Sequence, residues 1–196
     1  KTGGKKFDLS EVVQGLNMQM LLYLFTLGEN GVETLAAPGE AGVLYMPGSG
    51  HFTRGRRDAS DDSIAADQQK SYCMSGIVLE DTEVIEAMEL GTAGRYIPVS
   101  LKKDGSYTAT SSLITEEQLG LLRRQIAGNV VQMAELLHRG RIGAVPANRN
   151  GRLPCEYCDY RAVCGREIQW PDRPVVKLEK AEIYEQLEGG QLAWQM

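Results

Sequence analysis

The chain has 196 residues, of which 42% are hydrophobic and 24% are charged, as is ordinary for a globular domain with its own core. The net charge of −5 argues against a uniformly basic DNA-binding surface but is compatible with a local basic groove. No apolar run is long enough to cross a bilayer, and no secretory signal opens the chain. We therefore expect a cytoplasmic protein without a membrane segment.

The first third of the chain contains one strongly periodic segment. Apolar residues recur every three or four positions from Leu9 to about Leu27, which predicts a single helix buried on most sides. A short strand is expected at 42–46, where a Pro-Gly pair follows. The polar stretch 48–72 lacks a period and favours a long exposed loop or a partly disordered insertion.

The middle of the chain alternates extended and helical patterns. Residues 74–81 predict a strand, and residues 81–91 predict a short helix that is capped by Asp81 or Thr82. Residues 95–110 predict a hairpin, because two extended runs flank the turn signal Lys103-Asp104-Gly105.

A capping box opens the last long helix. Thr115 and Gln118 have the spacing of this motif, and an apolar stripe follows from Leu119 to Leu137 within a helix that extends to about Arg139. Residues 177–190 predict a short amphipathic helix in the tail. The order of these elements predicts a mixed α/β domain.

Three of the four cysteines form one motif. Cys155, Cys158 and Cys164 have C-x2-C-x5-C spacing, and thiolates are soft ligands for zinc or iron–sulfur clusters. In a reducing compartment this spacing indicates metal or cluster binding rather than disulfides. Cys73 lies alone at the edge of an expected strand, where a small core residue is more usual than a fourth ligand.

Gln19 and Tyr23 are four residues apart and share one helix face. A glutamine on an apolar helix needs a reason, since a buried amide must find hydrogen-bond partners. Two interpretations stay open. Gln19 faces the boundary of the core while Tyr23 is buried, or the two side chains flank an active site and contact a phosphate backbone.

The sequence resembles the RecB-type nucleases of the PD-(D/E)xK superfamily, and in particular the C-terminal nuclease domains of the AddB family, which belong to bacterial AddAB helicase–nucleases. In that family of RecB-type nucleases a catalytic strand ends in D-Y-K-[ST]-G, and the next helix carries Q-x-x-x-Y. Lys1-Thr2-Gly3 matches the end of the first motif, and Gln19 and Tyr23 match the second. The resemblance continues through 41–47, 74–89, 97–112 and 154–165 and so covers most of the chain.

The resemblance implies a partial restriction-endonuclease-like core over residues 1–150, a cysteine clasp over 151–170 and a tail helix within 171–196. It implies catalytic or active-site roles for Lys1, Gln19 and Tyr23. It also implies that Cys155, Cys158 and Cys164 are three ligands of a [4Fe–4S] cluster whose fourth cysteine lies far upstream. The carboxylates that bind Mg²⁺ would also precede Lys1, so no Mg²⁺ ligand is assigned in this chain, and a chain limited to these 196 residues is expected to be inactive and to hold no intact cluster.

The parent protein implied by this resemblance is a Mg²⁺-dependent DNA exonuclease that processes double-strand breaks for recombinational repair. Its partners would be DNA and an AddA-type helicase–nuclease subunit. The sequence contains no Walker A motif, so the ATP-driven helicase function is not expected in these residues.

Two alternatives are compatible with the same residues. The first is a non-catalytic DNA-binding or interaction module with a structural zinc ion, held by the three clustered cysteines and by Cys73, His51 or His138. The second is a stand-alone nuclease of the Cas4 type. Iron with sulfide would favour the nuclease family, and one zinc ion per chain would favour the module.

Overall fold

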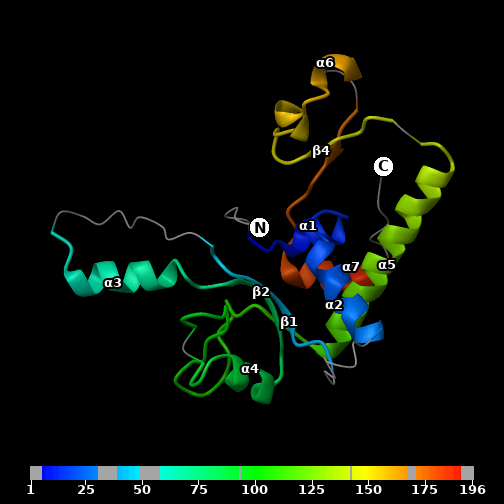
Figure 1. The fold of residues 1–196 in the computed structure, drawn as a ribbon. Helices are drawn as coiled ribbons and strands as arrows, with labels where there is room; N and C mark the ends of the chain where they lie inside the picture. The colour runs from blue at the N-terminus through cyan, green and yellow to red at the C-terminus, as the bar shows by residue number, and fades with distance from the viewer. Residues whose placement is uncertain are drawn as a thin grey trace. The chain divides into compact units, whose positions relative to one another are not determined.

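A computed structural model describes residues 6–30, 39–48, 58–92, 94–141, 143–166 and 171–190, except for the side chain of Asn30 (Figure 1). The chain divides into two compact units. The first unit comprises residues 1–8 and 19–119, and the second comprises residues 9–18 and 120–196. The described residues form helices and small sheets, which confirms the mixed α/β class.

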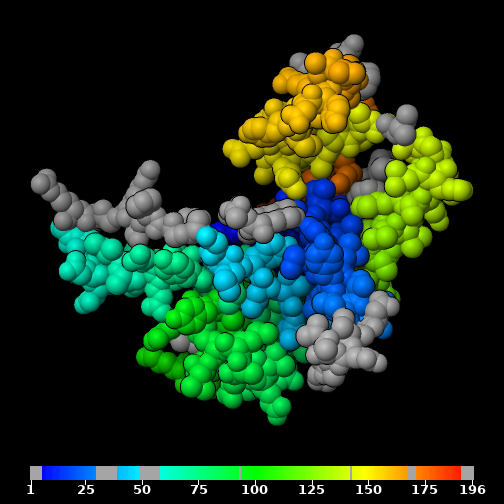
Figure 2. All heavy atoms as spheres, in the orientation of Figure 1, coloured from blue at the N-terminus to red at the C-terminus, as the bar shows by residue number. Residues whose placement is uncertain are grey.

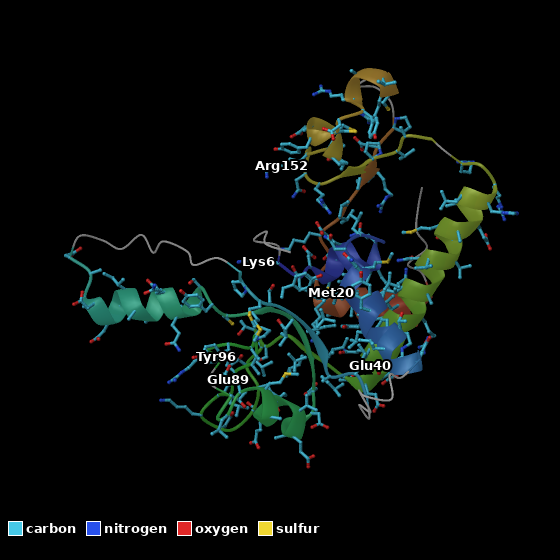
Figure 3. All side chains as sticks on the ribbon, in the orientation of Figure 1. Lys6, Met20, Glu40, Glu89, Tyr96 and Arg152 are labelled. Carbon is cyan, nitrogen blue, oxygen red and sulfur yellow. The ribbon has the colours of Figure 1, made fainter. Side chains whose placement is uncertain are left out.

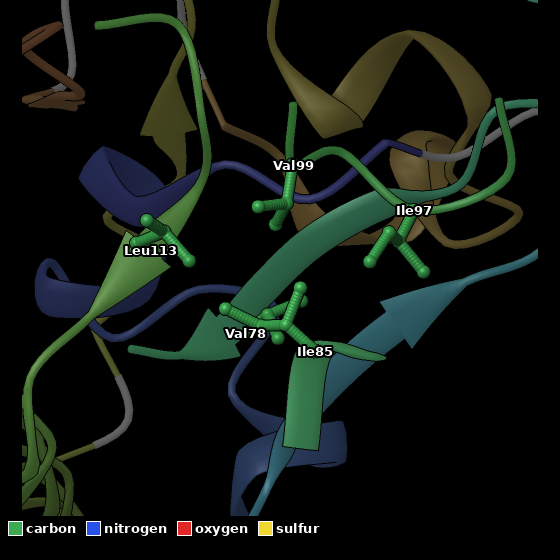
Figure 4. Packing of buried hydrophobic residues seen from close by; sticks show 5 residues of the cluster. All are labelled: Val78, Ile85, Ile97, Val99 and Leu113. Atoms are coloured by element: carbon green, nitrogen blue, oxygen red, sulfur yellow. The ribbon is translucent and has the colours of Figure 1, made fainter. Parts of the chain in front are cut away.

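The first unit is built on a three-stranded sheet of order β1-β2-β3. β1 (Gly42–Tyr45) pairs antiparallel with β2 (Ser75–Leu79), and β2 pairs parallel with β3 (Leu113–Ile114). The strands expected at 42–46 and 74–81 are therefore confirmed. The buried core of this unit contains Val78, Ile85, Ile97, Val99 and Leu113 (Figure 4).

Local capping signals define the helix and the hairpin that follow β2. Asp81 accepts hydrogen bonds from the backbone N–H groups of Glu83 and Val84, at 2.8 and 3.1 Å, and so caps α4 (Thr82–Met88) as expected. In the hairpin, the Asp104 carboxylate accepts from the N–H and the hydroxyl of Ser106, and these bonds lower the pKa of Asp104. The flanking runs form only one isolated bridge, Leu101 to Tyr107, rather than long strands.

The predicted exposed loop at 48–72 is wrong in its second half. Residues 49–57 lie outside the described part, but α3 (Asp61–Lys70) is a helix with no buried residue, drawn in cyan in Figure 1. The sequence signals that favour α3 lie at its two ends. The Ser60 hydroxyl accepts from the N–H of Ser63 at 3.3 Å, acidic residues occupy the first turn and Lys70 occupies the last.

The single helix predicted from Leu9 to about Leu27 is also wrong. The structure has α1 (Leu9–Val13) in the second unit and α2 (Gln19–Asn30) in the first. Gly15 and Asn17 between them have φ values of 82° and 56°. A left-handed backbone ends a right-handed helix, and glycine and asparagine adopt it at the least cost.

The break changes which face of α2 is buried. Leu21 and Phe25 are buried, whereas Met20, Tyr23 and Leu27 are 39%, 53% and 51% exposed. The expectation that this segment is buried on most sides is therefore wrong. The apolar pattern continues across the break, but residues before and after the break belong to two helices and do not share one face.

The second unit contains α1, most of α5 (Glu116–His138) and α7 (Lys180–Glu188). α1 contacts α7, and the Asn129 amide on α5 donates to the Val13 carbonyl of α1 at 3.3 Å. The capping box is confirmed: Thr115 and Gln118 exchange side-chain-to-backbone hydrogen bonds of 3.2 Å in both directions. The predicted stripe is buried at its start and exposed at Val130 and Leu137. α7 confirms the tail helix and buries Ile183, Tyr184 and Leu187.

Two polar side chains of α1 and the turn after it hold the segment before α7. The Ser10 hydroxyl bonds both the carbonyl and the N–H of Leu178, at 2.9 and 3.0 Å. One turn later, the Gln14 amide bonds the carbonyl and the N–H of Val176, at 2.7 and 3.0 Å. Arg173 donates to the Gln14 carbonyl at 2.9 Å, and burial lowers the pKa of this guanidinium. These bonds join parts of the chain that lie far apart in sequence.

Two short strands precede and follow the segment that carries the three clustered cysteines, which we call the clasp. β4 (Ala147–Asn148) pairs parallel with β5 (Arg173–Pro174), and the Asn148 amide donates to the Asp172 carboxylate at 3.0 Å. Between them lie the 3-10 helix η1 (Pro154–Tyr157) and the single-turn helix α6 (Arg161–Cys164). None of the helices in the described ranges is both long and apolar enough to span a membrane.

We expect Tyr184→Phe to raise the free energy of unfolding of the second unit by up to about 1 kcal/mol. The Tyr184 hydroxyl is buried and has no hydrogen-bond partner among the described residues, and burial raises the pKa of this phenol. Removing an unsatisfied polar atom relieves its desolvation cost. Thermal unfolding of the full-length protein measures the change. Tyr160→Phe is the matched control, because Tyr160 is 75% exposed and the substitution should leave the melting temperature unchanged. A lower melting temperature for Tyr184→Phe would contradict the expectation.

Candidate functional site

The expected catalytic lysine, Lys1, lies outside the described residues. The segment that follows it is anchored to the first unit's sheet. The Phe7 N–H donates to the Ser75 hydroxyl on β2 at 3.1 Å, and the Phe7 ring lies 6.2 Å from the Tyr45 ring on β1. Phe7 is therefore held against the strands β1 and β2.

Gln19 and Tyr23 form a hydrogen-bonded pair on the exposed side of α2. The Gln19 side-chain amide donates to the Tyr23 phenol oxygen at 2.6 Å. Tyr23 is 53% exposed, so the interpretation that places it in the core is wrong. The bond occupies a lone pair of the phenol oxygen and leaves its O–H proton to be donated to an acceptor such as a phosphate oxygen.

The body of α2 holds this pair in place. Leu21 and Phe25 on the opposite side are 1% and 5% exposed, and α2 contacts β1 within the first unit. A helix fixed by two buried side chains presents its outer face with little freedom. Figure 3 labels Met20, which is 39% exposed and lies on this outer face between Gln19 and Tyr23 in sequence.

The three clustered cysteines line one pocket in the second unit. Cys155 on η1, Cys158 after it and Cys164 on α6 surround a pocket of about 180 Å³, which is also lined by Leu153, Glu156, Arg161 and Arg166. All three thiols are free, and Cys158 and Cys164 are exposed. In Figure 2 the atoms of the clasp, coloured yellow to orange, are exposed on the surface shown.

The donor chemistry of this pocket fits a sulfur-ligated group, since three thiols line one space. The positions do not fit a single metal ion. Within the described ranges, no group of three or more His, Cys, Asp or Glu side chains is arranged to hold one.

Cys73 has the environment of a core residue. Its thiol is half-buried and lies 3.6 Å from the carbonyl oxygens of Met74 and Ile97. Burial raises the pKa of this thiol, and the charge of Glu89 adds to the effect. A group kept protonated is a poor metal ligand, because ligation requires the thiolate. Of the two histidines considered for zinc, His138 ends α5 and His51 lies outside the described residues.

The sequence analysis missed a tight hairpin before the clasp. Arg149 and Arg152 form an antiparallel bridge, and Asn150 and Gly151 between them have φ values of 52° and 84°. Positive φ at both central residues defines a type I′ turn, for which Asn-Gly is the preferred pair. The signal was present in the sequence as "RNGR" within a stretch that otherwise has no period.

Residues 1–165 match the family model of the PD-(D/E)XK nuclease superfamily. Similar proteins include the B subunit of the ATP-dependent helicase/deoxyribonuclease of Clostridium perfringens, which is 35% identical over 171 residues, covering 84% of this chain and 15% of the relative. The protein of the same name from Clostridium novyi is 33% identical over 204 residues, covering 100% of this chain and 18% of the relative. That of Caldanaerobacter subterraneus is 30% identical, covering 93% and 16%. The chain thus spans less than a fifth of the length of these relatives.

Proposed function

The chain belongs to the PD-(D/E)XK nuclease superfamily, and from this premise we propose that it forms part of the nuclease domain of a helicase–nuclease subunit that processes DNA ends. The relatives that support this proposal are named as helicase/deoxyribonuclease subunits. The full protein would be a Mg²⁺-dependent exonuclease acting on double-strand breaks together with an AddA-type partner.

The observation that carries the proposal is the hydrogen-bonded Gln19–Tyr23 pair on the exposed face of α2. In the proposed reaction, water attacks a phosphodiester and a DNA oxygen leaves with the electrons of the broken P–O bond. Tyr23 would donate its O–H to a phosphate oxygen, with Gln19 fixing the direction of the phenol. The Lys1 ammonium would orient the attacking water and stabilise the negative charge that develops on the phosphate.

Mg²⁺, when bound, would polarise the phosphate and lower the pKa of the attacking water. Among the described residues, no group of three or more His, Cys, Asp or Glu side chains is arranged to hold a metal ion. By resemblance, the carboxylates that bind Mg²⁺ lie outside this chain, so no residue of this chain is proposed as a Mg²⁺ ligand.

The direct test uses the full-length protein that contains this chain, purified with its partner. Linear double-stranded DNA is offered with Mg²⁺, and with EDTA in a parallel sample. Release of nucleotides from the ends in the Mg²⁺ sample alone is the expected result. Failure to degrade DNA under any divalent-metal condition would overturn the proposal.

We expect the 196-residue chain on its own to cleave no DNA. The resemblance places the metal-binding carboxylates elsewhere in the parent protein, so a lysine, a glutamine and a tyrosine would remain without the metal they assist. The measurement is the same nuclease assay on the isolated chain. Mg²⁺-dependent cleavage that co-purifies with it would show that the expectation is wrong.

We propose that Cys155, Cys158 and Cys164 supply three ligands to a [4Fe–4S] cluster in the full-length protein. The support is the single pocket that all three thiols line. A multi-iron cluster is larger than one ion, so its ligands need not surround a single point. Sulfur ligation of this kind requires thiolates, and the Cys158 and Cys164 side chains are exposed.

The Cys158→Ser variant of the full-length protein is expected to lose iron and sulfide together with its visible absorption. Cys73→Ser is the matched control, because Cys73 contacts main-chain carbonyls in the first unit, and it should retain both. Metal analysis of the two variants decides the matter. One zinc ion per chain without sulfide would instead favour the structural-zinc alternative.

A further inference from the structure

A second, larger pocket lies on the other side of η1 from the thiols. It has a volume of about 730 Å³ and is lined by Arg149, Asn150, Arg152, Leu153, Pro154 and Tyr157. In a 3-10 helix, residues three apart eclipse each other. Pro154 and Tyr157 therefore share one side of η1 and line this pocket, while Cys155 and Glu156 line the thiol pocket. We call the larger pocket the arginine–tyrosine groove.

The tight hairpin fixes one wall of the groove. Arg149 and Arg152 exchange two backbone hydrogen bonds of 3.0 Å each, across the Asn150-Gly151 turn. The Asn148 side chain also accepts from the Gly151 N–H at 2.7 Å. Residues that exchange both bonds lie directly opposite each other, and their side chains leave the hairpin on the same face. The two guanidinium groups are thus paired on one side by the backbone itself.

The placement of two arginines opposite each other does not stabilise the hairpin. Like charges directly opposite each other on a hairpin repel and destabilise it. Glu11 on α1 offsets part of the repulsion, because its carboxylate contacts the Arg149 guanidinium at 2.6 Å. Arg152 is exposed and makes no salt bridge with any described residue. Figure 3 shows Arg152 at the outer edge of the clasp. The hairpin therefore presents one cation that is positioned but not neutralised.

The groove is also lined by one aromatic residue, Tyr157 of η1. Tyr157 is 89% exposed, although a phenol ring gains from being covered. Glu156, the neighbouring acid, lines the thiol pocket rather than this groove. A guanidinium beside an exposed aromatic ring is the combination that binds single-stranded nucleic acid, with the cation on phosphate and the ring against a base. Paired bases in a duplex do not expose their faces to such a ring.

We propose that the arginine–tyrosine groove binds one unpaired DNA strand, with Arg152 on a backbone phosphate and Tyr157 stacked on a base. Arg149 is held by Glu11 and shapes the groove through the hairpin. This inference rests on the proposed function for its ligand class, and it assigns a strand contact within the second unit that is separate from Gln19 and Tyr23 in the first.

The test measures binding of fluorescently labelled oligothymidylate to the full-length protein by anisotropy, over a series of salt concentrations. Arg152→Ala is expected to weaken binding about 10-fold and to reduce the slope of log K against log salt by about 0.7, the share of one phosphate contact on a single strand. Tyr157→Ala should weaken binding roughly 5- to 100-fold, whereas Tyr157→Phe keeps the ring and most of the affinity.

Arg139→Ala is the matched control, because Arg139 is an arginine of the same unit whose side chain is 71% exposed, and it lies outside the groove. Unchanged affinity in Arg152→Ala or in Tyr157→Ala would overturn the proposal, and so would an equal loss in Arg139→Ala. Both groove side chains are exposed, so neither substitution should lower the melting temperature. Nuclease activity is assayed on the same preparations: normal cleavage with unchanged strand binding refutes the groove alone, whereas absent cleavage in the unsubstituted protein refutes the proposed function.

Discussion

Lys1→Ala in the full-length protein is expected to lower the rate of DNA cleavage by about 100- to 1,000-fold, the usual cost of removing one group that stabilises transition-state charge. By resemblance, Lys1 is the lysine of the D-Y-K-[ST]-G motif of RecB-type nucleases, and residues 1–165 match the PD-(D/E)XK nuclease superfamily to which they belong. An ammonium beside the phosphate stabilises charge that develops only as the bond breaks. The loss should therefore appear in kcat, with the affinity for DNA ends reduced little.

Lys6→Ala provides the control for this prediction. Lys6 is a lysine in the same segment, and it is exposed. If any positive charge near the site sufficed, both substitutions would reduce cleavage equally. We expect Lys6→Ala to cleave at the normal rate, and single-turnover kinetics on the two variants measures the difference. A Lys1→Ala protein with unchanged kcat would remove Lys1 from the catalytic machinery.

Elements with local signals were predicted from the sequence. Thr115 and Gln118 define the start of α5 through their own hydrogen bonds, and Asp81 does the same for α4. Such bonds involve neighbours in sequence, so the sequence alone specifies them. The family could also be predicted from the sequence, because its motifs are short and lie in order along the chain. The match of residues 1–165 to the family model confirms this prediction.

Features that depend on left-handed backbone conformations, or on packing between residues far apart in sequence, were not predicted. Apolar periodicity continues from α1 into α2, but Gly15 and Asn17 break the helix between them. The spacing of Gln19 and Tyr23 predicted a shared face, while the exposure of that face depends on which side of α2 meets the first unit's core. The "RNGR" turn carried a recognisable signal but no flanking alternation of apolar and polar residues, so it was not predicted as a hairpin.

Glu89 is a buried carboxylate of the first unit whose loss should cost considerable stability. It is 7% exposed, and its carboxylate accepts hydrogen bonds from the backbone N–H groups of Arg95, Tyr96 and Ile97, at 3.0, 2.9 and 3.1 Å. Figure 3 labels Glu89 and Tyr96 in this loop. The helical pattern of residues 81–91 gave no sign of this role, because the bonds are made by a side chain that follows the end of α4.

Glu89→Ala is expected to lower the free energy of unfolding of the first unit by about 3 kcal/mol or more, since three N–H groups would lose a charged acceptor. Ile97 is 1% exposed, so water reaches its amide poorly and cannot replace the carboxylate there. Hydrogen exchange of the full-length protein should show the loss of protection first at residues 95–97. Glu83→Ala, an exposed residue in the first turn of α4, is the control and should leave that protection intact.

Glu89→Gln separates the charge from the shape of this side chain. The amide keeps one acceptor oxygen, so the loop should be destabilised less than by alanine. The negative charge of Glu89 contributes to the raised pKa of Cys73, because a nearby anion disfavours the thiolate. Neutralising it should lower that pKa, increase the thiolate fraction at a fixed, mildly alkaline pH and speed alkylation of Cys73, followed by mass spectrometry of its peptide. If the alkylation rate is unchanged while residues 95–97 keep their protection from hydrogen exchange, burial alone sets the pKa of Cys73. If alkylation is faster while that protection is kept, the charge of Glu89 helps to keep this thiol protonated.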